Sequence, residues 1–355
     1  MDRSSPLYHP LTIGSLELPG NLFLAPVAGF TDRAFRSICA EAGADLCFTE
    51  LVSAEAVTRR PEQYGLGVAG DRAPAAAALL RRGVSEKRYA VQLFGGSPET
   101  LGRACALLAP LRPDAVDLNA GCPVPKVVKS GAGSALMRNP ALLGRIAGAM
   151  VTASRKYLGD VPVTVKMRSG WDAASINYAQ CARSAVEAGA AMITLHPRTR
   201  SQGYGGTSDW SHIADLASRL SVPVAGSGDL FTPEDAERMF RETGCAALMF
   251  ARGAQGNPPI FGAAKALFRG GSYAAAPEHL NRERLRMGLR HLELLAGDLG
   301  EKSACLEMRK QFCAYTRGAM GMPGLAGGGA LREKLVHART IAEYVTIVSP
   351  FLLCL

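Results

Sequence analysis

The chain has 355 residues, and its 40 basic and 31 acidic side chains give a formal net charge of +9. A hydrophobic content of 48% is enough to bury a sizeable core, which excludes an intrinsically disordered chain. No apolar run reaches the roughly 18 residues of a membrane span, and no signal peptide is visible. The nine cysteines are scattered without a CxxC pair. We therefore expect a reduced, cytoplasmic protein without a metal site or disulfide framework.

Eight short apolar runs are predicted to be β-strands, at residues 22–25, 45–51, 90–94, 115–118, 162–167, 192–196, 222–225 and 246–250. Stretches with a period near 3.6 predict helices at 32–42, 98–108, 140–157, 176–188, 210–220, 233–242 and 258–268, with 73–82 as a less regular candidate. Strict alternation implies a parallel sheet, and eight units favour an α/β fold of the (β/α)8 TIM barrel type. Residues 11–20 resemble a hairpin that would plug the bottom of this barrel.

The character of the sequence changes after residue 268. Residues 269–279 are typical of a linker, and residues 280–355 predict a small all-helical domain with a break at 318–329. We therefore predict a barrel domain of residues 1–268 and a C-terminal helical domain of residues 280–355. Residues 281–355 carry 11 basic and 7 acidic side chains. This excess suits an anionic partner such as nucleic acid, and an ordinary solvated helical face is the alternative.

Polar or glycine-rich segments follow seven of the eight predicted strands, at the end where barrel enzymes build their active sites. In chain order they supply Pro26, Val27, Ala28, Gln92, Asn119, Cys122, Lys166, Arg168, His196, Arg198, Ser227, Gly228, Asp229, Ala251 and Arg252. The loops after the seventh and eighth strands are rich in glycine, and each one leads directly into the start of a helix. With the guanidinium of Arg252 they predict a phosphate site, and an ordinary tight turn at 226–229 is the alternative.

Lys166 and Cys122 carry the two side chains at this rim, an ammonium and a thiol, that are most able to take part in a reaction. A buried ammonium needs an anionic partner, which a reduced flavin would provide, with Gln92 at the flavin edge. An ion pair with Glu50 and a Schiff-base role are alternatives for Lys166. Cys122 lies in a rim loop, where a protonated thiol can act as a general acid, or as a nucleophile if cations lower its pKa. His196 is expected to bind the flavin or to buffer protons.

Basic and aromatic residues occupy two neighbouring loops of the predicted rim. Arg198 and Tyr204 belong to the loop after the sixth strand, and Lys126 to the loop after the fourth. Unpaired bases are recognised by stacking and edge hydrogen bonds, and their phosphates by basic side chains. These loops therefore suit an extruded nucleotide, and solvated loop charges are the alternative.

Motifs along nearly the whole chain together resemble the tRNA-dihydrouridine synthases, which reduce uridine in tRNA with a flavin. The matching segments are 24–33 (LAPVAGFTDR), 91–94 (VQLF), 117–123 (DLNAGCP), 163–171 (VTVKMRSGW), 196–202 (HPRTRSQ), 228–229 (GD) and 251–258 (ARGAQGNP), with 308–310 (MRK) and 321–324 (GMPG) in the helical domain. The cysteine of the Asn-x-Gly-Cys-Pro motif is Cys122. Val27, Pro197, Ser227 and Pro259 depart from the family pattern, and Ser227 replaces an Asn that would contact the cofactor.

The resemblance implies an FMN-holding barrel followed by a tRNA-binding helical domain. Carried over by position, FMN would be held by Pro26, Val27, Ala28, Gln92, Lys166, His196, Ser227, Gly228, Asp229, Ala251 and Arg252. The target uracil would be contacted by Asn119, Arg168 and Arg198, beside Lys126 and Tyr204. NADPH or NADH would reduce FMN, hydride would pass from flavin N5 to C6 of uracil, and Cys122 would protonate C5. We expect a monomer bound to neither metal nor membrane. An FMN-dependent dehydrogenase of a free pyrimidine and a phosphate-binding aldolase-like barrel are the alternatives.

Overall fold

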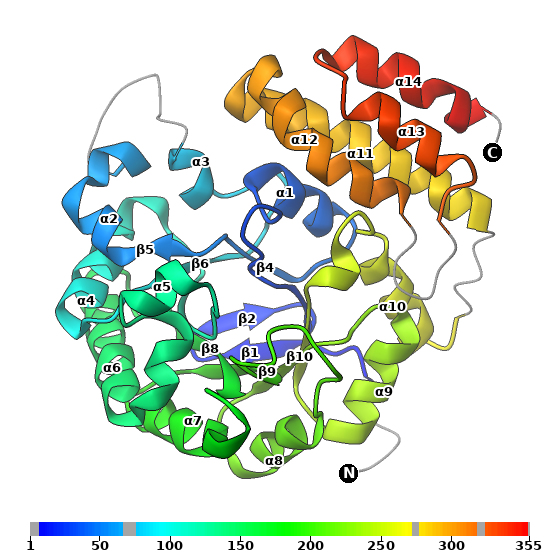
Figure 1. Ribbon diagram of the computed structural model, residues 1–355. Helices are drawn as coiled ribbons and strands as arrows, with labels where there is room; N and C mark the ends of the chain where they lie inside the picture. The colour runs from blue at the N-terminus through cyan, green and yellow to red at the C-terminus, as the bar shows by residue number, and fades with distance from the viewer. Residues whose placement is uncertain (1–6, 67–75, 272–276, 318–323, 354–355) are drawn as a thin grey trace.

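Eight parallel strands close into a barrel in this computed structural model, which describes residues 7–66, 76–271, 277–317 and 324–353 (Figure 1). The barrel strands are β3 (Leu22–Leu24), β4 (Leu46–Phe48), β6 (Tyr89–Phe94), β7 (Ala115–Ala120), β8 (Val163–Gly170), β9 (Met192–Thr199), β10 (Val224–Ser227) and β11 (Ala247–Phe250). Pairing of β4 with β6 closes the ring, and the two-residue β5 (Val52–Ser53) extends the edge of β6. The predicted TIM barrel is confirmed, with every strand within a few residues of its expected place.

The described part of the barrel region contains ten α-helices. They are α1 (Arg33–Glu41), α2 (Ala54–Arg59), α3 (Ala77–Leu80), α4 (Pro98–Leu107), α5 (Pro125–Lys129), α6 (Pro140–Tyr157), α7 (Tyr178–Glu187), α8 (Ser211–Arg219), α9 (Pro233–Thr243) and α10 (Ile260–Phe268). Short 3-10 helices lie at Pro61–Tyr64, Ala109–Leu111, Gly133–Arg138, Ala173–Ser175 and Arg252–Ala254. Side chains of Asp32, Ser97 and Thr232 cap α1, α4 and α9, because each accepts from a backbone N–H of the first turn. Residues 73–75 of the expected helix at 73–82 lie outside the described residues.

The hairpin predicted before the first barrel strand is present. β1 (Leu11–Ile13) pairs antiparallel with β2 (Leu16–Leu18), and alternate residues of both strands are buried. Their four leucine and isoleucine side chains join an apolar cluster with residues from the lower barrel interior, including Phe23, Phe48 and Met192. The hairpin therefore plugs the N-terminal end of the barrel, so the opposite rim is left for a site.

Four helices of the described ranges 277–317 and 324–353 follow the barrel and pack together beside α1 (Figure 1): α11 (Pro277–Leu299), α12 (Glu301–Thr316), α13 (Gly328–Leu335) and α14 (Ile341–Leu353). Their core contains Leu292, Phe312, Tyr315 and Tyr344, all buried. α11 begins inside the range that we predict as a linker, and residues 318–323 of the expected break lie outside the described residues. None of the helices in the described part of the chain is long and apolar enough to cross a membrane.

Asp32 joins these helices to the barrel. Besides capping α1, its carboxylate accepts from Nε2 of Gln311 at 2.6 Å and lies 3.2 Å from Nε2 of the buried His291. Arg33 forms an ion pair with Asp298 on α11. Because Asp32 follows the C-terminal end of β3, the helices are fixed near the C-terminal rim rather than near the plugged end of the barrel.

Candidate active site

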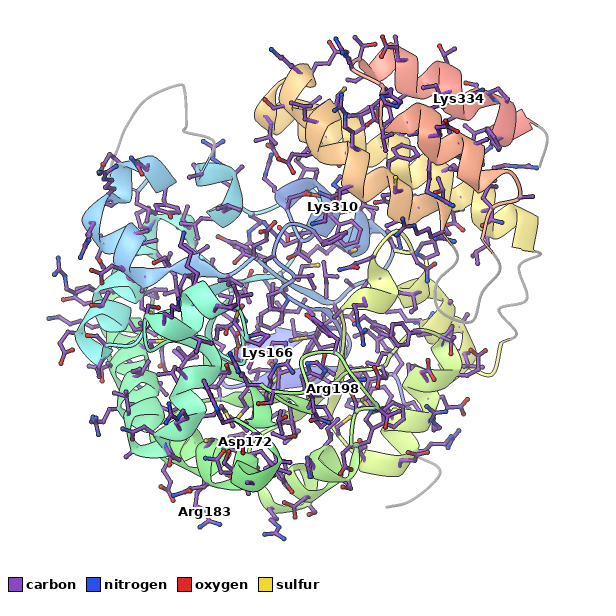
Figure 2. The ribbon with its side chains drawn as sticks, in the orientation of Figure 1. Lys166, Asp172, Arg183, Arg198, Lys310 and Lys334 are labelled. Carbon is purple, nitrogen blue, oxygen red and sulfur yellow. The ribbon has the colours of Figure 1, made fainter. Side chains whose placement is uncertain are left out.

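Two adjoining cavities open at the C-terminal rim of the barrel, and they share Pro26, Val27, Lys166, His196 and Tyr204. The larger encloses about 270 Å³. Figure 2 shows Lys166 and Arg198 near the middle of the ring of strands. Of the residues predicted for the site, the structure brings these to the cavity walls: Pro26, Val27, Ala28, Asn119, Cys122, Lys166, Arg168, His196, Tyr204, Ser227, Gly228, Asp229, Ala251 and Arg252.

Gln92, Lys126 and Arg198 do not line either cavity. Gln92 is fully buried and Arg198 is 2% exposed, whereas Lys126 lies on the outer surface of α5. The walls also include apolar residues that sequence reasoning missed, such as Leu51, Leu230 and Phe231. Apolar loop residues of this kind carry no sequence signal that separates them from core residues.

Lys166 projects from β8 into both cavities without a protein partner. Among the described residues, no carboxylate forms an ion pair with it and no acceptor receives a hydrogen bond from its Nζ, although Asp117 lies near enough to attract it. Burial, assisted by repulsion from Arg168, lowers the pKa of Lys166 to about 8. The ion pair with Glu50 that the sequence leaves open is not among the ion pairs of the described residues, and Glu50 instead accepts from the backbone N–H of Gly29 at 2.8 Å. An anionic ligand in the cavity would satisfy this ammonium.

Asp229 organises the arginines on the opposite wall. Both its oxygens accept from Arg198, at 2.9 and 2.8 Å, and one also accepts from Arg252 at 3.0 Å. Burial opposes ionisation, but bonds from Arg198 and from the backbone N–H of Ser208 lower the pKa of Asp229. Arg252 in turn lies 4.8 Å from the ring centre of Tyr204 and 5.0 Å from that of Phe231. The guanidinium of Arg252 is therefore held at the cavity mouth, where a phosphate would meet it.

Arg198 donates its hydrogen bonds to acceptors within the protein. Its nitrogens donate to the carbonyls of Gly205 and Gly206, to the hydroxyl of Ser208 and to both oxygens of Asp229. A guanidinium has five N–H groups, so these bonds leave none for a substrate in this conformation. A contact between Arg198 and uracil stays a prediction, and it would require one of these bonds to break.

His196 faces the cavity between the cations. Burial, followed by the charges of Lys166, Arg168, Arg198 and Arg252, lowers its pKa well below 6.5. The imidazole is therefore neutral at neutral pH, and its Nε2 lies 3.3 Å from Nη1 of Arg198. Of the two roles predicted for His196, ligand binding by a neutral ring fits this environment, and buffering of protons near pH 7 does not.

Gly228 lets the loop after β10 pack closely against the side chains of Ser208 and His196 at the cavity wall. Its φ of +106° favours glycine, and a Cβ there would lie 2.5 Å from Oγ of Ser208 and 2.8 Å from Cδ2 of His196. The neighbouring Ser227 donates its hydroxyl to the carbonyl of Met249 at 2.9 Å. The backbone of this loop, rather than the Ser227 side chain, is therefore placed to contact an anion ahead of α9.

Cys122 lies in the loop after β7 and is 9% exposed. Its backbone N–H donates to Oδ1 of Asn119 at 2.9 Å, and its carbonyl accepts from the N–H of Ser134 at 3.0 Å. Burial raises the pKa of its thiol, although Arg168 and Lys166 act in the opposite direction. A nucleophilic cysteine would need a lowered pKa, so the environment favours the protonated thiol of a general acid.

Arg168 crosses the floor of the larger cavity beside Cys122. Its Nε donates to the carbonyl of Gly121 at 2.9 Å, and Nη1 donates to the carbonyls of Thr199 and Gly203 at 2.9 and 2.8 Å. Among the described residues, Nη2 has no acceptor. Arg168 therefore keeps donors free for a ligand, in contrast to Arg198. The residues that the structure describes include no group of three or more His, Cys, Asp and Glu side chains able to hold a metal ion.

Comparisons with known proteins identify relatives of the chain. A family model described as "Dihydrouridine synthase (Dus)" matches residues 23–347. The chain is 42% identical over 347 residues to the "Probable tRNA-dihydrouridine synthase" of Treponema pallidum (strain Nichols), covering 96% of each protein. It is 38% identical over 249 residues to "tRNA-dihydrouridine synthase B" of Pseudomonas aeruginosa, covering 70% of each.

Solved structures share the barrel at low sequence identity. The old yellow enzyme homologue from Zymomonas mobilis has a TM-score of 0.51 at 13% identity, over 75% of this chain and 93% of that one. Histamine dehydrogenase from Rhizobium sp. 4-9 has a TM-score of 0.55 at 15% identity, over 82% of this chain and 51% of that one. These likenesses establish the TIM-barrel fold alone.

Proposed function

The chain belongs to the dihydrouridine synthase family, and on this basis we propose that it reduces a specific uridine of tRNA to 5,6-dihydrouridine with FMN and an NADPH or NADH electron donor. The named relatives act on tRNA. The match to this family disfavours the two alternatives considered from the sequence, an aldolase-like barrel and a dehydrogenase of free pyrimidines.

The residues around the cavity fit FMN. Lys166 presents a positive charge that has no ion-pair partner among the described residues, Gly228 lines the cavity wall with its backbone, and Arg252 presents a guanidinium at the mouth. We assign the cofactor contacts to Pro26, Val27, Ala28, Lys166, His196, Ser227, Gly228, Asp229, Ala251 and Arg252. A contact from Gln92 stays a prediction, because Gln92 lines neither cavity. When bound, FMN supplies the hydride that adds to C6 of the uracil ring.

The observation that carries the proposal is the Cys122 thiol, which lines the cavity with a raised pKa. A protonated thiol can give its hydrogen to C5 of uracil as the C5–C6 double bond is consumed, so the S–H bond breaks while a C5–H bond forms. Lys166 and Arg168 then stabilise the thiolate, since both attract its negative charge. A solvent proton restores the thiol, and oxidation of the nicotinamide donor balances the electrons.

Substrate positioning falls to the loops after β7, β8 and β9. Arg168 and Asn119 lie on the wall next to Cys122, and the free Nη2 of Arg168 can donate to a uracil carbonyl. Tyr204 is 58% exposed over the mouth, where its ring can stack on an extruded base. We assign Arg198 to holding this loop, with uracil contact through Arg198 as a further expectation, and Lys126 to the tRNA backbone.

We assign tRNA binding mainly to residues 280–355, with the barrel of residues 1–268 as the catalytic domain and a monomer acting in the cytoplasm. The 11 basic side chains of residues 281–355 outnumber the 7 acidic ones, and Figure 2 shows Lys334 and Lys310 on or beside these helices. Contacts between basic side chains and phosphates release counterions. Binding of tRNA should therefore weaken steeply between 50 and 200 mM salt, and a flat response would contradict this assignment.

The decisive experiment replaces the proposed acid. Cys122→Ala should yield a yellow enzyme that NADPH still reduces but that forms little dihydrouridine in tRNA, with a loss of about 100-fold or more. Cys105→Ala, at a fully buried cysteine that lines neither cavity, is the matched control and should keep its activity. Near wild-type formation of dihydrouridine by Cys122→Ala would show that the proton comes from elsewhere.

A further inference from the structure

A chain of buried hydrogen bonds runs beneath the cavity and ends at the backbone of Cys122. Thr164 Oγ1 donates to Oδ1 of Asp117 at 2.5 Å, and Gln92 Nε2 donates to Oδ2 of Asp117 at 2.7 Å. Asn119 Nδ2 donates to Oε1 of Gln92 at 2.8 Å, and Oδ1 of Asn119 accepts from the N–H of Cys122 at 2.9 Å. Residues of β6, β7 and β8 thus connect one carboxylate to the catalytic loop.

The residues of this chain are buried, so water cannot substitute for a lost partner. Asp117, Gln92 and Thr164 are fully buried and Asn119 is 7% exposed. The strand register places Gln92 opposite Asp117 and Asp117 opposite Thr164, so these side chains meet across neighbouring strands. Asp117 lines neither cavity and therefore does not contact the ligand directly.

The direction of the chain follows from its carboxylate. Burial raises the pKa of Asp117 to about 7. Whether or not Oδ1 holds a proton, Oδ2 accepts from Nε2 of Gln92, which leaves Oε1 of Gln92 for Asn119. That oxygen in turn draws Nδ2 of Asn119, which leaves Oδ1 as the acceptor for the N–H of Cys122. If either amide were reversed, two N–H donors would face each other in a buried place and lose their acceptors.

We propose that Asp117 is a positioning residue, whose carboxylate fixes the amide orientations of Gln92 and Asn119 and thereby holds the loop that presents Cys122. This inference rests on the proposed function only in so far as Cys122 is the proton donor. The sequence motif around Cys122 includes Asp117, but the proposed chemistry gives it no other task. Its position therefore assigns a role through geometry rather than through contact with substrate.

Asp117→Asn tests the direction of the chain with almost no change in shape. The new amide offers a single acceptor oxygen. Either the hydroxyl hydrogen of Thr164 loses its acceptor, or Nε2 of Gln92 faces another N–H donor and the amides downstream reverse. Release of the loop should raise the alkylation rate of Cys122 by iodoacetamide about threefold or more, measured by mass spectrometry of the Cys122 peptide. In tRNA reduction, kcat should fall about tenfold while KM for tRNA stays within about twofold.

Two further variants separate positioning from general damage. Thr164→Val removes the hydrogen bond to the other oxygen of Asp117 without reversing any amide, so alkylation of Cys122 should stay at the wild-type rate. The double variant Asp117→Asn with Gln92→Glu restores an acceptor toward Asn119, because the new carboxylate receives a bond from each neighbouring amide. We expect its alkylation rate to return to within about twofold of wild type.

The outcomes are decisive whichever way the variants behave. Equal alkylation of wild type and Asp117→Asn, equal effects of Asp117→Asn and Thr164→Val, or no recovery in the double variant would each overturn the proposal. If Asp117→Asn is insoluble, a soluble double variant with wild-type alkylation supports it, and an insoluble double variant overturns it. Alkylation needs neither FMN nor tRNA, so these results are independent of whether Cys122→Ala abolishes uridine reduction.

Discussion

Replacing Lys166 by methionine should make the flavin-free protein more stable while impairing flavin binding. The pKa of Lys166 falls from 10.5 to about 8 because the folded protein buries its charge. At about 1.4 kcal/mol for each pKa unit, this fall corresponds to about 3 kcal/mol of destabilisation at neutral pH. Lys166→Met removes the charge from a similar volume, so the free energy of unfolding should rise by about that amount.

The sign of this effect depends on pH in a predictable way. A lowered lysine pKa destabilises the folded state fully below the folded value of about 8. The destabilisation disappears as the pH rises toward 10.5, where the unfolded state also loses the proton. The stability advantage of Lys166→Met should therefore be largest at pH 7 and should shrink above pH 8.

The assay is urea unfolding of flavin-free wild type and Lys166→Met at pH 7, followed by flavin titration. Lys265→Met is the matched control, because Lys265 forms a 2.8 Å ion pair with the buried Asp45 and its removal should lower stability. Loss of a charged hydrogen-bond partner should weaken flavin binding by Lys166→Met about 10- to 100-fold. A Lys166→Met protein less stable than wild type at pH 7 would refute the argument that this charge is unsatisfied.

Three further predictions concern the core, the thiol and the mouth of the site. Glu86→Gln should lower the free energy of unfolding by about 3–5 kcal/mol, because it leaves the fully buried Arg36 guanidinium without a carboxylate; a loss below about 1 kcal/mol in urea would show that the pair matters little. Alkylation of Cys122 should accelerate with pH beyond pH 9, because burial raises its thiol pKa; a rate already constant at pH 7 would indicate a thiolate instead. Tyr204→Ala should raise KM for tRNA about 10-fold, since stacking contributes about 1–3 kcal/mol per base; an unchanged KM in steady-state assays would argue against stacking.

The barrel and the composition of its rim were predictable because both depend on local patterns. Strands buried on two faces are continuous apolar runs, and polar residues at their carboxyl ends stand out against that background. Lys166 and Cys122 are examples, since each is polar or reactive where the neighbouring residues are apolar. The plugging hairpin was predictable for the same reason, because alternate residues of 11–18 are apolar.

The use that each polar group makes of its hydrogen bonds was not predictable. Gln92 and Arg198 were expected to face ligands, yet Gln92 is bonded to Asp117 and Asn119, and Arg198 is bonded to Asp229 and loop carbonyls. Such pairings depend on side-chain conformations and on contacts between distant segments, which periodicity does not record. The same holds for His291 and Asp32, which meet although they are 259 residues apart.

The plug formed by β1 and β2 has a kinetic consequence. Because the hairpin fills the N-terminal end of the barrel, a ligand reaches Lys166 from the opposite rim, through the mouth over which Tyr204 lies. The nicotinamide donor and the tRNA would then enter through the same opening of the cavity and bind one after the other. We expect alternating turnover, in which each of the two reactants competes with the other for the form of the enzyme it does not use. Parallel lines in double-reciprocal plots of rate against the concentration of one reactant, at several concentrations of the other, would indicate this ping-pong mechanism.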